Sequence, residues 1–153
     1  MTPMATAQTS VTVRLRQEAD YRFALEFAPG AAPFHSDEPP PLGGGTGPSP
    51  MQLLAAAVGN CLADSLLFAL RKFKQNAEPI SAEAEAVLGR NEQNRLRVQG
   101  LQVKLTLGAA ADTLQRLDHV LAQFEDFCTV TQSVRPAFPV TVEVYDSGGR
   151  RLK

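Results

Sequence analysis

The chain has 153 residues, of which 44% are hydrophobic and 20% are charged, and its formal net charge is -1. This composition is that of a folded globular protein rather than a disordered one, and the length fits a single domain. Because the charges nearly balance and Lys and Arg form no long run, neither nucleic acid nor an anionic membrane is favoured as a partner. We therefore expect one domain over residues 1–153, with residues 1–9 as a flexible tail.

Two stretches near the N-terminus alternate apolar and polar residues, which is the pattern of half-buried β-strands. They run from Val11 to Leu15 and from Tyr21 to Phe27, with a short turn at Glu18–Asp20 between them. This arrangement predicts a β-hairpin. Residues 28–48 are rich in Pro and Gly and show no periodicity, so we expect a long loop of a kind that is often functional.

A long apolar helix is predicted to begin at Pro50. Ser49 can serve as its N-cap, Pro50 suits the first helical position, and Gln52 completes an S-x-x-Q capping box. The stretch from Leu53 to Leu70 is apolar on almost every side and is long enough to cross a membrane. It is nevertheless rich in Ala and contains Asn and Asp, so a buried central helix of a soluble protein is the better interpretation.

The next segments predict two strands. Apolar residues alternate from Ile80 to Leu88 and again from Leu96 to Leu107. The apolar phase slips by one residue at Gly100, which indicates a β-bulge there.

Helical spacing then returns from Leu114 to Cys128, and Thr129 with Gln132 forms a second possible capping box, so a short helix is expected just after Cys128. Alternation from Val140 to Val144 predicts a last strand. The predicted order is β-β-α-β-β-α-α-β, that of an α+β domain with a mostly antiparallel sheet.

The only two cysteines are Cys61, inside the central helix, and Cys128. The N-terminus does not resemble a secretory signal, so we expect a cytoplasmic protein, in which a structural disulfide is unusual. Cys61 is either a small core residue or a nucleophile, and the nearby carboxylate of Asp64 disfavours its thiolate unless a cation intervenes. Cys128 either extends the apolar stripe of the second helix or lies at the N-terminus of the short one, where negative charge is favoured.

Metal and nucleotide sites are not indicated. The spacing of His35 and His119, to each other and to the cysteines, matches no zinc motif, and His119 is expected at the surface. The glycine-rich "GGGTGP" lacks the Lys-Ser/Thr pair that completes a phosphate-binding loop. We therefore expect neither a metal nor a cofactor.

Three motifs together resemble the OsmC/Ohr superfamily of small thiol-dependent proteins, which includes organic-hydroperoxide reductases. They are "DEP" at Asp37–Pro39, "GGGTGPSPMQLLAAAVGNC" from Gly43 to Cys61, and "FCTVTQSV" around Cys128. The resemblance extends from Asp37 to Val144. It implies the OsmC-like fold with a long buried central helix, in an intertwined homodimer whose two active sites lie at the subunit interface.

The resemblance also implies roles for the cysteines. In the peroxidase branches the first cysteine attacks the peroxide and the second resolves the product, which assigns attack to Cys61 and resolution to Cys128. Those branches carry a glutamate directly after the proline that opens the helix, where this "PSPM" variant has Met51. That glutamate acts with an arginine to keep the first cysteine a thiolate. Candidate arginines in the first hairpin are Arg14, Arg16 and Arg22.

Asp37 and Glu38 lie in the long loop, where carboxylates are usually solvated. Glu38 is a candidate for part of the work of the missing glutamate. Met51, Phe34 and Leu54 are expected to line an apolar pocket that favours alkyl peroxides.

The function that the resemblance implies is reduction of organic hydroperoxides through a Cys61 sulfenic acid and a Cys61–Cys128 disulfide. An external dithiol, of the lipoyl type or another, would then reduce the disulfide. The alternative is a stress or binding protein with little or no turnover, or a thiol redox sensor. Met51 in place of the glutamate favours that alternative.

Overall fold

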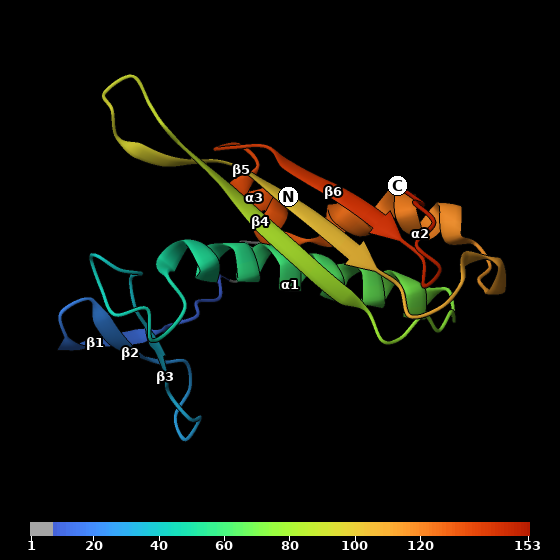
Figure 1. Cartoon of the computed structure of the whole chain (residues 1–153). Coiled ribbons are helices and arrows are strands. Elements are labelled where there is room, and N and C mark those ends of the chain that lie inside the picture. Colours follow the sequence, from blue (N-terminus) through green and yellow to red (C-terminus); the bar gives the residue numbers. More distant parts are fainter. Residues whose placement is uncertain (1–7) are drawn as a thin grey trace, which may run out of the picture. The chain divides into compact units, whose positions relative to one another are not determined.

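The computed structural model describes residues 8–153 and forms two compact units, one ending at Pro50 and one running from Met51 to Lys153 (Figure 1). Most of the expected N-terminal tail, residues 1–9, lies outside the described residues. The two units are described in turn.

The N-terminal unit contains a three-stranded sheet in the order β1-β2-β3, with both pairs of neighbours antiparallel. Its strands are β1 (Arg14–Ala19), β2 (Arg22–Glu26) and β3 (Phe34–Ser36). The predicted hairpin is confirmed, because β1 pairs with β2 and Leu15 lies opposite Leu25. The strands are shorter than the alternating pattern, which began at Val11 and ended at Phe27.

The prediction of a structureless loop over residues 28–48 is wrong, because β3 lies inside it. β3 pairs with β2 and places Phe34 opposite Leu25. Three residues are too few to show a period of two, so the sequence pattern carried no signal for this strand.

Asp37 follows β3 directly and is buried, which corrects the expectation of a solvated loop carboxylate. Its carboxylate accepts hydrogen bonds from the N–H groups of Glu38 (2.9 Å), Gly44 (3.2 Å) and Thr46 (3.1 Å), and from the Thr46 hydroxyl (2.8 Å). The Thr46 hydroxyl is the largest single cause of a lowered pKa at Asp37. Asp37 therefore closes the loop over residues 37–46 through polar contacts.

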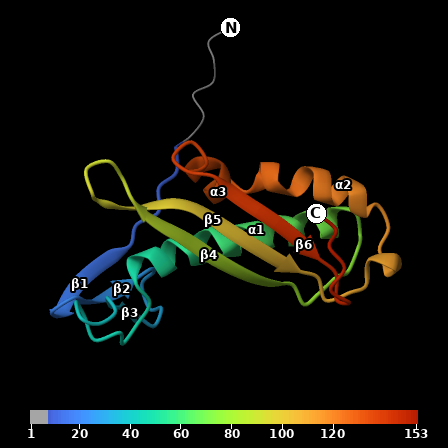
Figure 2. The same ribbon diagram turned by 45° about the horizontal axis from the view of Figure 1, so that its top comes forward.

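The second unit combines a long helix, a three-stranded sheet and a set of short helices (Figures 1 and 2). Its elements are α1 (Pro50–Lys72), β4 (Ser81–Arg90), β5 (Leu96–Thr106), η1 (Ala111–Thr113), α2 (Leu117–Gln123), η2 (Phe124–Phe127), α3 (Thr129–Val134) and β6 (Val140–Tyr145). The sheet order is β4-β5-β6; β4 and β5 are antiparallel, and β6 runs parallel to β5. The predicted α+β architecture is confirmed, with one parallel pair among its neighbouring strands.

The β-bulge predicted from the phase slip is present. Val87 pairs with Gly100 and Leu88 pairs with Val98, so Gln99 is the extra residue on β5. A single extra residue moves the apolar side chains of the strand to the opposite parity, which is the slip visible in the sequence.

The single helix predicted from Leu114 to Cys128 is wrong, because the segment is broken at both ends. Arg116, the N-cap of α2, has a left-handed backbone (φ 57°), so the helix starts only at Leu117. Beyond α2 the chain tightens into η2 and becomes extended at Cys128 (φ -80°, ψ 95°).

The short helix predicted after Cys128 is confirmed as α3, but its predicted capping box is wrong. Cys128 itself is the N-cap, without a side-chain cap, and Thr129 is the first helical residue. The Gln132 side chain instead donates to the backbone carbonyl of Glu125 (3.1 Å).

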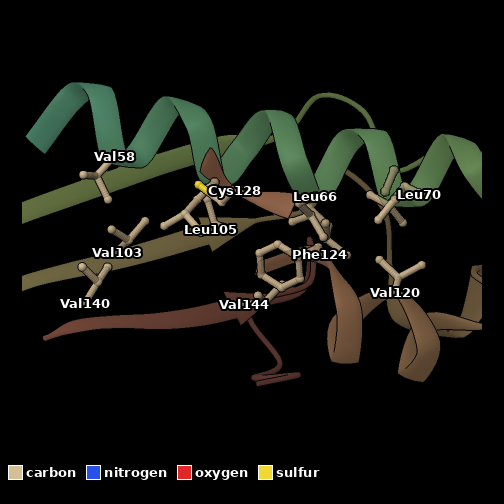
Figure 3. Packing of buried hydrophobic residues seen from close by; sticks show 14 of the residues in the cluster. Val58, Leu66, Leu70, Val103, Leu105, Val120, Phe124, Cys128, Val140 and Val144 are labelled. Carbon is tan, nitrogen blue, oxygen red and sulfur yellow. The ribbon is translucent and has the colours of Figure 1, made fainter. Parts of the chain in front are cut away.

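The core of the second unit lies between α1, β5, β6 and the segment from α2 to Cys128 (Figure 3). α1 contributes a stripe of buried residues four apart, Val58, Leu62, Leu66 and Leu70, all at most 1% exposed. This stripe packs with Val103 and Leu105 of β5 and with Val120, Phe124 and Cys128. α1 is long and apolar enough to cross a membrane, a property that core helices of globular proteins share, and its buried stripe belongs to this core.

Candidate functional site

The two cysteines lie against each other in the second unit. Cys61 comes from the middle of α1 and is half-buried, whereas Cys128 is completely buried at the junction of η2 and α3. Both thiols are free, and their side chains are close enough for Cys128 to perturb the pKa of Cys61. The fold thus brings together a reachable thiol and a hidden one, as a dithiol reaction requires.

The helical repeat of α1 sets the exposure of Cys61. Its neighbours Leu62 and Ser65 are buried, so Cys61 lies at the border of the buried stripe. On the solvent side, Asn60 donates from Nδ2 to the Asp64 carboxylate at 2.8 Å. One turn of helix separates Asp64 from Cys61, which keeps this negative charge near the thiol.

The surroundings of Cys61 favour the protonated thiol. Burial raises the pKa of Cys61, and the hydrogen bond and charge of Cys128 and the charge of Asp64 raise it further. The backbone N–H of Val130 donates to the sulfur and acts in the opposite direction. The predicted effect of Asp64 is therefore confirmed in sign, and in these surroundings Cys61 carries less thiolate at neutral pH than a free cysteine.

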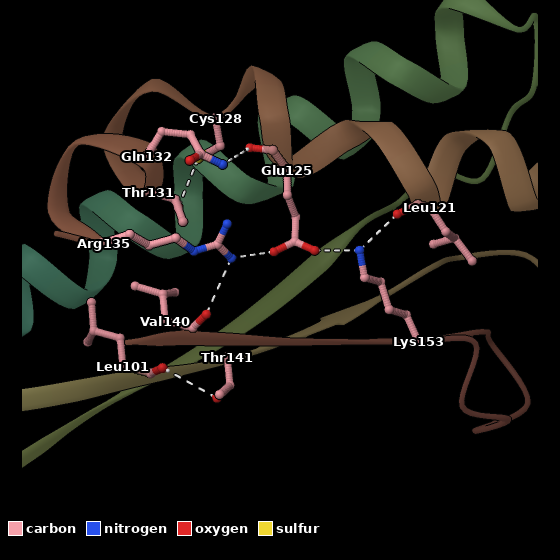
Figure 4. Close-up of polar contacts among 10 residues, drawn as sticks. All are labelled: Leu101, Leu121, Glu125, Cys128, Thr131, Gln132, Arg135, Val140, Thr141 and Lys153. Atoms are coloured by element: carbon pink, nitrogen blue, oxygen red, sulfur yellow. Dashed lines mark hydrogen bonds and ion pairs between the residues drawn. The ribbon is translucent and has the colours of Figure 1, made fainter. Parts of the chain in front are cut away.

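Cys128 satisfies both structural interpretations that the sequence left open. It belongs to the apolar core, and it is also the N-cap residue of α3. Its thiol donates to the hydroxyl oxygen of Thr131 at 3.0 Å, and Thr131 is itself completely buried (Figure 4). Sequence reasoning missed Thr131, although the spacing C-x-x-T places the hydroxyl one helical turn beyond the thiol.

A half-buried ionic cluster holds the backbone around Cys128 (Figure 4). The Glu125 carboxylate pairs with Arg135 and with Lys153, and Arg135 also donates to the carbonyl of Val140 (3.3 Å). The backbone N–H of Cys128 donates to the carbonyl of Glu125 (3.1 Å). Glu125 therefore connects the segment that carries Cys128 to α3 and to the C-terminal residues.

The pKa of Glu125 shows which effect dominates in this cluster. Burial alone would raise it, but the hydrogen bonds and charges of Lys153 and Arg135 outweigh burial, so the pKa lies below its ordinary value. Sequence reasoning missed this cluster, because its three members are far apart in the chain.

The remaining predicted site residues fall in both units. Met51 and Leu54 lie half-buried in the first turns of α1. In the N-terminal unit, Arg22 pairs with Glu18 (3.1 Å) and the Phe34 ring stacks on Phe27, with centroids 5.1 Å apart. The pocket formed by Met51, Phe34 and Leu54, and the roles of Glu38 and Arg22, stay predictions.

The histidines have ordinary contacts. His35 pairs through Nδ1 with Glu18 at 2.8 Å, and His119 is exposed on α2 beside the ring of Phe73, as expected for a surface residue. Across residues 8–153, no three side chains of His, Cys, Asp or Glu are grouped so as to hold a metal ion.

Comparisons with known proteins agree with this geometry. A family model described as "OsmC-like protein" matches residues 43–143, a span that contains both cysteines. A comparison with functionally curated proteins gives no match.

Solved structures share the fold at low sequence identity. The organic hydroperoxide resistance protein OsmC from Legionella pneumophila is 17% identical, with a TM-score of 0.71 over 91% of this chain and 98% of its own. OhrB of Bacillus subtilis is 17% identical, with a TM-score of 0.67 over 90% and 99%. An OsmC-like protein of unknown function from Vibrio cholerae O1 biovar eltor is 18% identical, with a TM-score of 0.74 over 90% and 99%. With its α+β fold and paired cysteines, the chain therefore belongs to the OsmC-like family of the OsmC/Ohr superfamily.

Proposed function

We propose that this protein is a dithiol peroxidase that reduces organic hydroperoxides with Cys61 and Cys128. The observation that carries the proposal is the pair of neighbouring free thiols, one half-exposed and one completely buried. Membership of the OsmC-like family supports it, since two structural relatives are named organic hydroperoxide resistance proteins.

Exposure supports Cys61 as the attacking thiol and Cys128 as the resolving thiol. A peroxide in solution can reach Cys61 but not Cys128, which has no exposed surface. The Cys61 thiolate attacks one peroxide oxygen, the O–O bond breaks, and the other oxygen leaves as an alcohol after taking a proton. Cys61 is then a sulfenic acid, and the peroxide has been reduced by two electrons.

The second thiol completes the reaction. The Cys128 sulfur attacks the Cys61 sulfur, the S–O bond breaks, and the hydroxyl group leaves as water with the proton of the Cys128 thiol. The Cys61–Cys128 disulfide is then reduced by an external dithiol through two exchange steps, which restores both thiols and oxidises the reductant. No cofactor takes part. A reducing compartment such as the cytoplasm would supply such a reductant.

A stress or binding protein with little or no turnover is the second candidate, and the raised pKa of Cys61 favours it. The thiolate is the attacking species, so a raised pKa lowers its population at neutral pH. Met51 stands where the peroxidase branches have glutamate, which points the same way. Fast peroxidase chemistry would require a cation beside Cys61. We propose Arg22 for that cation and Glu38 for part of the work of the missing glutamate.

Single-turnover oxidation distinguishes the two candidates. Reduced protein is mixed with cumene hydroperoxide or with hydrogen peroxide, and thiol loss is followed in the wild type, in Cys61→Ser and in Cys128→Ser. A peroxidase loses both thiols rapidly, prefers the organic peroxide, and gives a Cys61–Cys128 disulfide that Cys61→Ser cannot form. Thiol loss no faster than that of free cysteine, and equal for both peroxides, would contradict the proposal. Repeating the reaction with Glu38→Gln and Arg22→Ala tests whether either residue activates Cys61.

We also propose that the protein works as a homodimer. A groove of about 500 Å³ lies between α1 and β4 and is lined mostly by small apolar side chains, among them Ala55, Ala63 and Ala84. Such a surface suits close contact with another backbone. Sedimentation equilibrium at micromolar concentration should give twice the chain mass of 16.5 kDa, and a monomer would contradict this part of the proposal.

A further inference from the structure

The first turn of α3 contacts both sulfur atoms. The backbone N–H of Val130 donates to Cys61, and the hydroxyl of the next residue, Thr131, accepts from the Cys128 thiol at 3.0 Å. Thr131 is polar yet completely buried. Its hydroxyl has lost its contact with water, which is costly, and the Cys128 thiol is a hydrogen-bond partner that offsets this cost. Val has the same shape and would fill this place in the core equally well. Core packing alone therefore does not explain why a hydroxyl is buried here.

We propose that Thr131 is a positioning residue for the resolving step, holding the Cys128 sulfur where it attacks Cys61. This inference rests on the proposed function, and it assigns the buried hydroxyl a task in closing the disulfide.

The first argument is geometric. A cysteine side chain has three staggered χ1 positions, and a disulfide forms only when both sulfurs adopt a narrow range of relative orientations. The hydrogen bond to Thr131 selects one of these positions for Cys128. Thr131 is itself β-branched and completely buried on a helix, so few χ1 positions are open to it and its hydroxyl is held in place. Cys128 is thereby held beside Cys61 before any peroxide arrives.

The second argument concerns the proton. During resolution the Cys128 sulfur loses its hydrogen and develops negative charge in a buried place, where an unpaired charge is costly. A hydroxyl both accepts and donates, so Thr131 can accept from the thiol before reaction and donate to the sulfur as the proton leaves. A methyl group in the same place can do neither. Thr131 thus fits both states of the sulfur that the step passes through.

The test uses disulfide closure without peroxide. Reduced protein is treated with 5,5′-dithiobis(2-nitrobenzoic acid), and release of the coloured thiolate is followed in stopped flow. The first release reports attack by Cys61 on the reagent, and the second reports attack by Cys128 on the mixed disulfide at Cys61. The Cys128→Ser variant identifies the second release by removing it.

Thr131→Val keeps the shape of the side chain and removes the hydroxyl. We expect the first release to be unchanged within about twofold and the second to slow by about five- to tenfold, the effect of one lost hydrogen bond. Thr131→Ser, which restores the hydroxyl, should close within about threefold of the wild-type rate. Should Thr131→Val fail to fold, Thr131→Ala compared with Thr131→Ser makes the same test.

Two results would overturn the inference. Closure as fast in Thr131→Val as in the wild type would show that the hydroxyl plays no part in the step. Equal slowing in Thr131→Val and Thr131→Ser would show that shape, and not the hydroxyl, matters. Because no peroxide is used, slow reaction with cumene hydroperoxide would sink the proposed function and leave this result standing.

Discussion

Cys61 and Cys128 reach their contact from two different kinds of local structure. Cys61 lies in a regular helix of 23 residues, and its place follows from a buried stripe that repeats every four residues. Cys128 lies where η2 ends and α3 begins, at an extended residue held by Thr131 and by the backbone near Glu125. Apolar packing thus places the first thiol, whereas polar contacts with residues three positions away on either side help to place the second.

This contrast predicts which properties of the protein should change when residues around each thiol are substituted. Changes in α1 should act through stability and through the thiolate population of Cys61. Changes around Cys128 should act on disulfide closure and on the pH dependence of stability. The predictions below test this division, beginning with the largest expected effect.

Replacing either cysteine should separate the two chemical steps. Cys61→Ser should abolish peroxide-dependent thiol loss, because Cys128 is completely buried. Cys128→Ser should still react once and stop at the sulfenic acid, which dimedone traps. Intact-mass spectrometry should find the dimedone adduct only in Cys128→Ser. An adduct on Cys128 in the Cys61→Ser protein would reverse the assigned roles.

Shortening the buried stripe of α1 should have the largest effect on folding. Leu66 is completely buried in the core cluster beside Phe124 (Figure 3), so Leu66→Ala leaves a cavity and should cost about 2–5 kcal/mol of unfolding free energy. Urea denaturation gives this value. Phe68→Ala is the matched control, because Phe68 lies on the exposed side of the same helix. This change should cost far less. Equal losses would show that α1 is not anchored through this stripe.

Neutralising Glu125 should change stability and its dependence on pH. Glu125→Gln leaves Arg135 and Lys153 without their carboxylate partner and should cost about 1–3 kcal/mol at pH 7. Because the folded pKa of Glu125 is lowered, its contribution is complete above its ordinary value of 4.5 and is lost as pH falls through the folded pKa.

Melting temperatures between pH 7 and pH 3 test this sign. The difference between wild type and Glu125→Gln should be largest near pH 7 and should shrink below pH 4.5. Asp37 and Asp146 also have lowered pKa values, so both proteins lose stability in acid and only their difference isolates Glu125. A difference that stays constant with pH would contradict the ionic role.

Removing the charge of Asp64 should have the smallest effect of these changes, and it should alter only the reactivity of the Cys61 thiol. Asp64 is the weakest of the causes that raise the pKa of Cys61, so Asp64→Asn should lower that pKa modestly. Alkylation by iodoacetamide at pH 7 should then speed up by about two- to threefold. Asp118→Asn, on exposed α2, is the control and should leave the rate unchanged. A slower reaction in Asp64→Asn would show that the carboxylate supports Cys61.

The sequence predicts much of this fold because most of its elements have a clear periodicity. The first hairpin, α1 beginning at Pro50, the β4–β5 pair with its bulge and the last strand all have alternating or helical patterns long enough to recognise. β3 was missed because it is three residues long. The break at Arg116 was missed because its left-handed backbone has no Gly or Asn to announce it.

The site divides in the same way. The contact between the cysteines follows from family resemblance and from the two apolar patterns that carry them. Asp37, Thr131 and the Glu125 cluster were not predicted, because each depends on hydrogen bonds that exist only once the chain has folded. A polar residue in an apolar or glycine-rich stretch gives no periodic signal, even when it is buried.

The distance in sequence between the two thiols links oxidation to folding. A Cys61–Cys128 bond would close a loop of 67 residues (128 minus 61), which contains β4, β5 and α2. In the chain-entropy description, such a loop restricts the unfolded chain enough to stabilise the oxidised protein by about 4 kcal/mol. By the same thermodynamic cycle, forming the disulfide is more favourable in the folded protein than in the unfolded chain, by that same free energy. The melting temperature of this protein would then rise and fall with each turn of its redox cycle.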